Sequence, residues 1–163
     1  MKDYQNRGNT RYVLLSVFSL LFISFITYKE ALGYYFIGRD TFPVIWASRI
    51  HSYEDILRII STPLGGNLTF WDMYRPISQL SFGIDYLIWG YNPFGYHLTD
   101  LLIHLLNTLL VFWLATILLK DSKYRLLGAW LSALLFSISP VNINLIPTIN
   151  RRHDMVAATF LIL

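Results

Sequence analysis

The sequence predicts an all-α membrane protein: a polytopic bundle of transmembrane helices that carries amphipathic helices on its external surface. Of the 163 residues, 55% are hydrophobic and only 14% are charged, whereas about 25% are charged in an average soluble domain. Uncharged apolar runs lie between the charges, and their lengths are close to the roughly 18 residues that a helix needs to cross a bilayer. Basic residues gather at the ends of these runs. Together the three observations exclude a soluble globular domain.

Four apolar segments are predicted to span the bilayer, at about residues 12–28, 96–119, 126–140 and 154–163. The first is short for a span, and His104 is the only ionisable residue between Leu101 and Leu119 in the second. The third is also short and ends where Ser139 and Pro140 break the pattern. The fourth stops in mid-helix at Leu163. We therefore expect residues 1–163 to be the N-terminal part of one larger transmembrane domain.

Basic residues predict the orientation of the bundle, because short segments rich in Lys and Arg stay in the cytoplasm. They precede the first span and fill the turn between the second and third: Lys2, Arg7, Arg11, Lys120, Lys123 and Arg125. The N-terminus is therefore expected in the cytoplasm, with residues 29–95 as an external loop. Arg151 and Arg152 then lie on the external side. Either an anionic ligand or snorkelling toward the membrane surface explains them.

Several classes of function find no support in the sequence. The sequence has no cysteine, so it has neither a disulfide framework nor a thiolate metal site. It also has no basic stripe with interleaved aromatic residues that would indicate nucleic-acid binding. No glycine-rich phosphate loop or nucleophile motif is present. We expect no cofactor, and nothing in the sequence indicates a divalent metal.

The external loop predicts two amphipathic helices. Ser52 and Asp55 have the spacing of a capping box, so a helix should follow over residues 53–61. Pro76 suits the first turn of a second helix. Apolar residues recur at helical spacing in that helix: Ile77, Leu80, Ile84, Leu87 and Ile88. Aromatic residues cluster around both helices, so we expect the two to lie flat on the membrane surface.

The second predicted span carries a polar stripe. His97, Asp100, His104 and Asn107 fall on one face of a helix. Lipid would not tolerate that face, so it should point into the bundle or line a wet cavity. The two histidines are two turns apart, about 10 Å of rise, which one metal ion can hardly bridge. Interhelical hydrogen bonding is favoured over metal ligation.

Two segments resemble a known family. Residues 74–115 contain YRPISQ, NPFGYH and HLLN in that order, and residues 134–163 read LLFSISPVNINLIPTINRRHDMVAATFLIL. These segments resemble GT-C membrane glycosyltransferases, in particular bacterial dolichyl-phosphate-mannose mannosyltransferase-like proteins and transmembrane tetratricopeptide-repeat O-mannosyltransferases. The resemblance implies a GT-C-like fold in a bacterial inner membrane or a similar one. It also implies transfer of a sugar such as mannose from a polyprenyl-phosphate donor to an extracytoplasmic protein or glycan.

The resemblance also implies which residues form the site. The family's general base is an aspartate early in the external loop, where this sequence has Asp40. The family usually has a second acidic residue beside it, and here that neighbour is Arg39. This departure leaves the donor class and metal dependence open. A salt bridge to Arg39 or a helix cap is the alternative role of Asp40.

The family's Arg-x-Asp motif corresponds to the cluster of Arg151, Arg152 and Asp154 at the start of the fourth span. The resemblance implies that these arginines bind the carrier phosphate, and guanidinium groups suit that task. Arg75 in the YRP motif is a further candidate, and a packing or headgroup contact explains it equally well. The competing hypothesis for the chain is a non-catalytic four-span accessory or transport protein.

Overall fold

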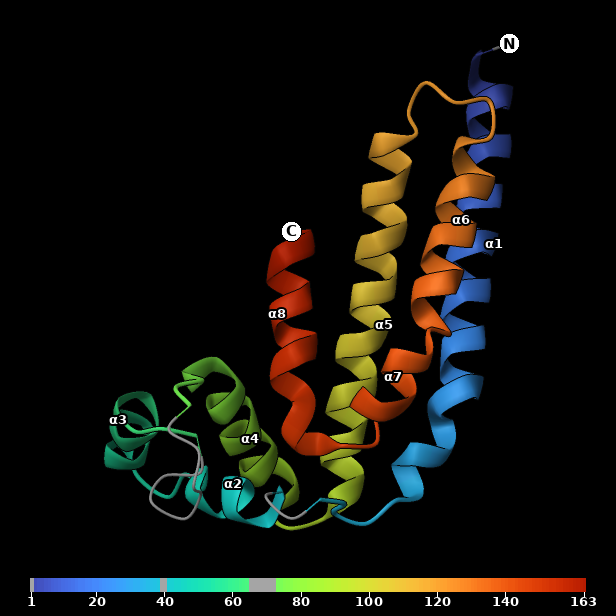
Figure 1. The fold of residues 1–163 in the computed structure, drawn as a ribbon. Helices are drawn as coiled ribbons and strands as arrows, with labels where there is room; N and C mark the ends of the chain where they lie inside the picture. Colours follow the sequence, from blue (N-terminus) through green and yellow to red (C-terminus); the bar gives the residue numbers. More distant parts are fainter. Residues whose placement is uncertain (1, 39–40, 65–72) are drawn as a thin grey trace.

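The computed structural model describes residues 2–38, 41–64 and 73–163, and every regular element in them is a helix. Its longest helices are α1 (Lys2–Tyr28) and α5 (Pro93–Leu118). Figure 1 shows them running side by side with α6 (Arg125–Ser137), while α8 (Arg152–Ile162) lies on the other side of α5. The other helices gather at one end of this bundle. They are η1 (Lys29–Gly33), α2 (Thr41–Ala47), α3 (Tyr53–Ser61), α4 (Pro76–Trp89), α7 (Pro140–Leu145) and η3 (Ile149–Arg151).

Two of the described helices are long and apolar enough to cross a bilayer. The segments that meet this criterion are Thr10–Gly33 and Pro93–Leu118, which correspond to the first two predicted spans. The third predicted span is α6, with 13 residues, and the fourth is α8, with 11 residues. Helix α6 is shorter than the 17 residues or so that a spanning helix needs. Two spanning helices are thus supported by length and composition.

The arrangement agrees with the basic-residue pattern. The turn between α5 and α6 lies at the same end of the bundle as the start of α1 (Figure 1). Helices α2, α3 and α4, and the start of α8, lie at the opposite end. The two basic flanks recognised in the sequence therefore share one end of the molecule.

Local sequence explains where the helices begin. The helix predicted over residues 53–61 is α3, and Asp55 Oδ2 accepts backbone hydrogen bonds from His51 at 2.8 Å and Ser52 at 3.1 Å. Pro76 and Pro93 both occupy the first turn of their helices, where a missing N–H costs nothing. The side chain of Asn92 caps α5 by accepting from the Phe94 amide at 3.2 Å.

Helix α4 exposes its apolar side and buries its polar side. Its exposed residues include Ile77, Ile84, Leu87 and Ile88, each between 54% and 66% exposed. Ser78 and Asp85 are buried, at 4% and 3% exposure. A helix on the surface of a soluble protein shows the opposite pattern. The inversion favours lipid around the outer face of α4.

A hydrogen-bonded junction joins α1 to the break between α6 and α7. Pro140 opens α7 as expected from the pattern break, and the Ser137 side chain just before the break is buried. Tyr28 donates its hydroxyl to the Ser137 carbonyl at 2.8 Å, and the hydroxyls of Ser24 and Ser137 lie 2.6 Å apart. These contacts satisfy polar groups that the end of α6 would otherwise leave buried without partners.

Candidate functional site

A buried ionic cluster fastens the start of α8 to α4 and α5. Arg152 Nη1 lies 2.6 Å from Asp85 Oδ2, and Nε donates to Asp100 Oδ1. The same guanidinium donates to Ser81 Oγ at 3.1 Å and to the Tyr96 carbonyl at 2.9 Å. The side chains of Arg152 and Asp100 are fully buried. Two carboxylates and one guanidinium therefore share a site closed to solvent.

The cluster gives Arg152 a structural role. Each of its three side-chain nitrogen atoms already has a protein acceptor, and its guanidinium carbon lies 4.4 Å from the centre of the Phe82 ring. Burial raises the pKa of Asp85, while the charge of Arg152 opposes that rise. Arg152 was predicted, together with Arg151, to bind the carrier phosphate. In the structure its side chain points into the protein instead.

The polar stripe on α5 faces other helices. Asn107 donates to the Met155 carbonyl on α8 at 2.9 Å and accepts from the Thr159 hydroxyl at 2.7 Å. The His104 ring lies edge-on to Tyr28, with centroids 5.0 Å apart, and stacks on Phe136 at 5.9 Å. The interhelical hydrogen bonds expected from the stripe are confirmed for Asn107.

The sequence left open whether the stripe points into the bundle or lines a wet cavity, and in the structure its four residues lie between packed helices. His97, Asp100, His104 and Asn107 are each at most 1% exposed. They fill the space between helices because α1, α6 and α8 close over that face of α5. Within residues 2–38, 41–64 and 73–163, no group of three or more His, Cys, Asp or Glu side chains is placed to hold a metal ion.

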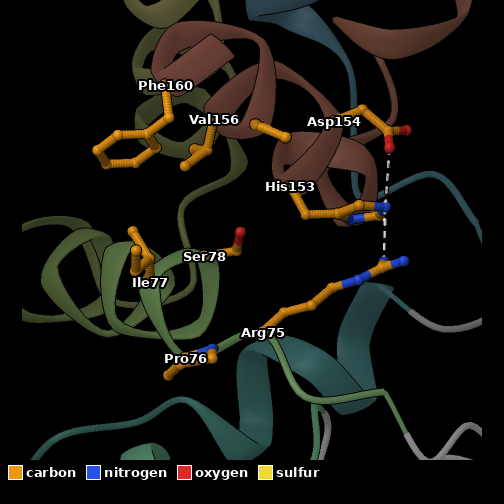
Figure 2. Close-up of a pocket in the computed structure, with 9 residues that line it drawn as sticks. Arg75, Pro76, Ile77, Ser78, His153, Asp154, Val156 and Phe160 are labelled. Carbon is orange, nitrogen blue, oxygen red and sulfur yellow. Dashed lines mark hydrogen bonds and ion pairs between the residues drawn. The ribbon is translucent and has the colours of Figure 1, made fainter.

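A pocket of about 440 Å³ lies between the start of α4 and the first turns of α8. Figure 2 shows polar groups on one side, where Arg75 reaches toward His153 and Asp154. Ile77, Val156 and Phe160 lie on the other side, farther along the two helices. Pro76, Ser78 and Ala157 complete the wall. The volume is within the range of about 300–1,000 Å³ typical of small-molecule sites.

A chain of charged contacts forms the polar side of the pocket. Arg75 Nη1 lies 2.6 Å from His153 Nε2, and that nitrogen lies 3.2 Å from Asp154 Oδ1. Asp154 Oδ2 in turn lies 3.4 Å from Arg151 Nε. The side chains of Arg151 and Asp154 are 52% and 41% exposed. Two arginines, one carboxylate and one imidazole are therefore accessible around this side of the pocket.

The structure divides the predicted site residues into two groups. Arg75 and Asp154 line the pocket, and Arg151 joins them through Asp154. Arg152, Asp100, His97, His104 and Asn107 belong to the packed interior. Asp40 and its neighbour Arg39 lie outside the described residues, so the expected role of Asp40 stays a prediction.

Sequence reasoning missed two residues. Asp85 was not among the predicted site residues: its partner Arg152 is 67 positions away in the chain, and nothing local indicates the pairing. His153 was not among the predicted site residues either. Its position between two charged residues was the available signal.

The chain is similar to several proteins named protein O-mannosyl-transferase. It is 33% identical over 111 residues to human protein O-mannosyl-transferase TMTC2, a match that covers 68% of this chain and 12% of that protein. It is 26% identical over 142 residues to Tmtc1 of Drosophila melanogaster, covering 83% of this chain and 16% of the relative. Human TMTC4 is 30% identical over 100 residues, or 55% of this chain and 14% of the relative.

The chain thus spans only about an eighth to a sixth of the length of these relatives. No protein-family model and no solved structure matches it. The similarity supports a distant relationship to mannosyltransferase-like proteins over part of their length.

Proposed function

We propose that this chain contributes to a membrane glycosyltransferase that moves a sugar, mannose by analogy with the relatives' names, from a polyprenyl-phosphate carrier to a protein or glycan acceptor outside the cytoplasm. In this proposal it belongs to a multi-pass, GT-C-like bundle with a cytoplasmic N-terminus. The observation that carries the proposal is the pocket between α4 and α8, which joins a cationic side to an apolar side.

The two sides of the pocket match the two parts of a lipid-linked donor. Arg75 and Arg151 can give charge-assisted hydrogen bonds to a phosphate. Ile77, Val156 and Phe160 offer an apolar surface to the first isoprene units. Because the outer face of α4 is itself apolar, the rest of a long carrier can remain in the lipid. Arg152 takes no part in binding and holds the start of α8 in place.

The proposed reaction needs a base and a leaving group. The acceptor oxygen forms a bond to the anomeric carbon of the sugar, while the bond from that carbon to the phosphate oxygen breaks. Asp40 takes the proton of the acceptor hydroxyl. The electron pair of the broken bond stays on the phosphate, and the arginines stabilise its added negative charge. The products are the glycosylated acceptor and polyprenyl phosphate.

The test is transfer of labelled mannose from polyprenyl-phosphate mannose in membranes that contain the protein, expressed with any further sequence that its gene encodes. Replacing either Arg75 or Arg151 by Met should weaken donor affinity about ten- to a hundredfold, since one charge-assisted contact is worth about 1.5–3 kcal/mol. The control is Arg125→Met, which removes an exposed arginine at the other end of the bundle. Absence of transfer by the wild-type protein would favour the accessory or transport hypothesis.

A further inference from the structure

His153 is placed to respond to the charge state of the pocket. Its Nδ1 lies 3.0 Å from the Asn150 carbonyl oxygen. Its Nε2 lies between two groups of opposite character, 2.6 Å from Arg75 Nη1 and 3.2 Å from Asp154 Oδ1. One ring nitrogen therefore faces a donor and an acceptor at the same time, as the dashed lines in Figure 2 show.

The protonation state of His153 decides which of the two neighbours it can bind. A guanidinium only donates hydrogen bonds, so Nε2 can accept from Arg75 only when it carries no proton. Nδ1 then carries the proton and donates to the Asn150 carbonyl. When Nε2 is also protonated, it can no longer accept from Arg75. It can donate to Asp154 Oδ1 without moving the ring far, because that oxygen is already 3.2 Å away.

We propose that His153 acts as a proton-dependent latch on Arg75: neutral His153 holds the guanidinium, and protonated His153 turns to Asp154 and leaves Arg75 free to bind a lipid-linked phosphate. The proposal rests on the function proposed above and adds a residue that makes donor binding depend on pH. Binding of the phosphate and uptake of one proton by His153 are then coupled, because each favours the other.

The direction of the pH dependence follows from the groups around His153. Burial lowers its pKa, Asp154 opposes that effect, and the positive charges of Arg75 and Arg151 reinforce it. These groups come from the start of α4, from η3 and from α8. In the empty pocket the pKa is below its usual value of about 6.5, and a bound phosphate raises it by supplying negative charge. Affinity for phosphate should therefore rise as the pH falls from the bound-state pKa toward the free-state pKa.

The experiment measures the dissociation constant of farnesyl methyl phosphate for the purified protein in nanodiscs between pH 5.5 and 8. This phosphodiester keeps a single negative charge over the whole range, so its own ionisation does not contribute. The wild-type protein should bind it more tightly at lower pH, by up to about tenfold per pH unit, as expected for one coupled proton. Inorganic phosphate and farnesol test the head and the tail separately, and both should bind at least tenfold more weakly.

Three variants separate the latch from the pocket itself. His153→Ala should bind the probe with the same affinity at every pH, because Arg75 is permanently released. His51→Ala, which removes an exposed histidine outside the pocket, should keep the wild-type slope. Arg75→Met should lose most binding at every pH.

The possible failures are distinguishable. An unchanged slope in His153→Ala, or no slope in the wild-type protein, would overturn the latch and leave the proposed donor site intact. No binding of the probe by the wild-type protein at any pH would overturn the donor site and the latch with it. Equal affinity for inorganic phosphate would show a site for free phosphate and remove the lipid from the proposal.

Discussion

Arg152 Nη1 on α8 lies 2.6 Å from Asp85 Oδ2 on α4, and the two side chains are 0% and 4% exposed. Replacing Arg152 by Met should lower the free energy of unfolding by about 3–5 kcal/mol, because Asp85 and Asp100 would be left buried without a counter-charge. Denaturant-induced unfolding in detergent measures this loss. Arg151→Met is the matched control. It removes a half-exposed ion pair with Asp154 and should cost no more than about 1 kcal/mol. Equal losses in the two variants would contradict the structural role of Arg152.

Gly83 allows α4 to pack closely against the loop that follows α2. A β-carbon at this position would lie 2.6 Å from Ile50 Cδ1 and 2.8 Å from the Ser48 carbonyl oxygen. Ile50 can rotate away, but the backbone oxygen cannot. Gly83→Ala should therefore destabilise the protein by about 1–3 kcal/mol, measured by thermal unfolding. Gly33→Ala meets no atom within 4 Å and serves as the control. A Gly83→Ala variant as stable as this control would show that α4 can shift at no cost.

The orientation in the membrane can be tested with single cysteines, since the natural chain has none. Glu54 on α3 and Ser122 in the turn between α5 and α6 are both exposed and lie toward opposite ends of the bundle. A cysteine at Glu54 should react with an impermeant maleimide in intact cells, whereas one at Ser122 should react only after the cells are opened. The reverse pattern would place the proposed donor site on the cytoplasmic side.

Asp40 is the residue expected to act as the base. Asp40→Asn keeps the size of the side chain and removes the proton acceptor, so the rate of sugar transfer should fall by about 10² to 10⁴. Donor affinity should change little. Transfer by purified wild type and variant is compared at equal folded concentration. Activity within about threefold of wild type would remove Asp40 from the mechanism and leave Asp154, beside the pocket, as the carboxylate to test next.

Local chemistry made several elements predictable. The capping-box spacing gave the bounds of α3, and the apolar period together with Pro76 gave α4. The stripe from His97 to Asn107 correctly indicated a face of α5 that is buried against other helices. These features depend on residues within a few turns of one another, so a single segment of sequence contains them.

The site was harder to predict because its contacts join distant segments. Arg151 and Arg152 were treated as a pair because they are adjacent in the chain. Consecutive residues near a helix start point about 100° apart, and here one guanidinium is 52% exposed while the other is fully buried. Which arginine turns inward depends on Asp85 and Asp100, and their position relative to α8 is a property of the folded bundle.

The junction at Ser137 has a consequence for the order in which the chain assembles. The hydroxyl of Tyr28 that reaches the Ser137 carbonyl belongs to a segment made 109 residues earlier. During synthesis α1 is therefore complete long before α6 ends, so the Tyr28 hydroxyl is already present when the Ser137 carbonyl is made. The polar groups of Ser137, at the break between α6 and α7, can therefore be hydrogen-bonded as soon as the break forms.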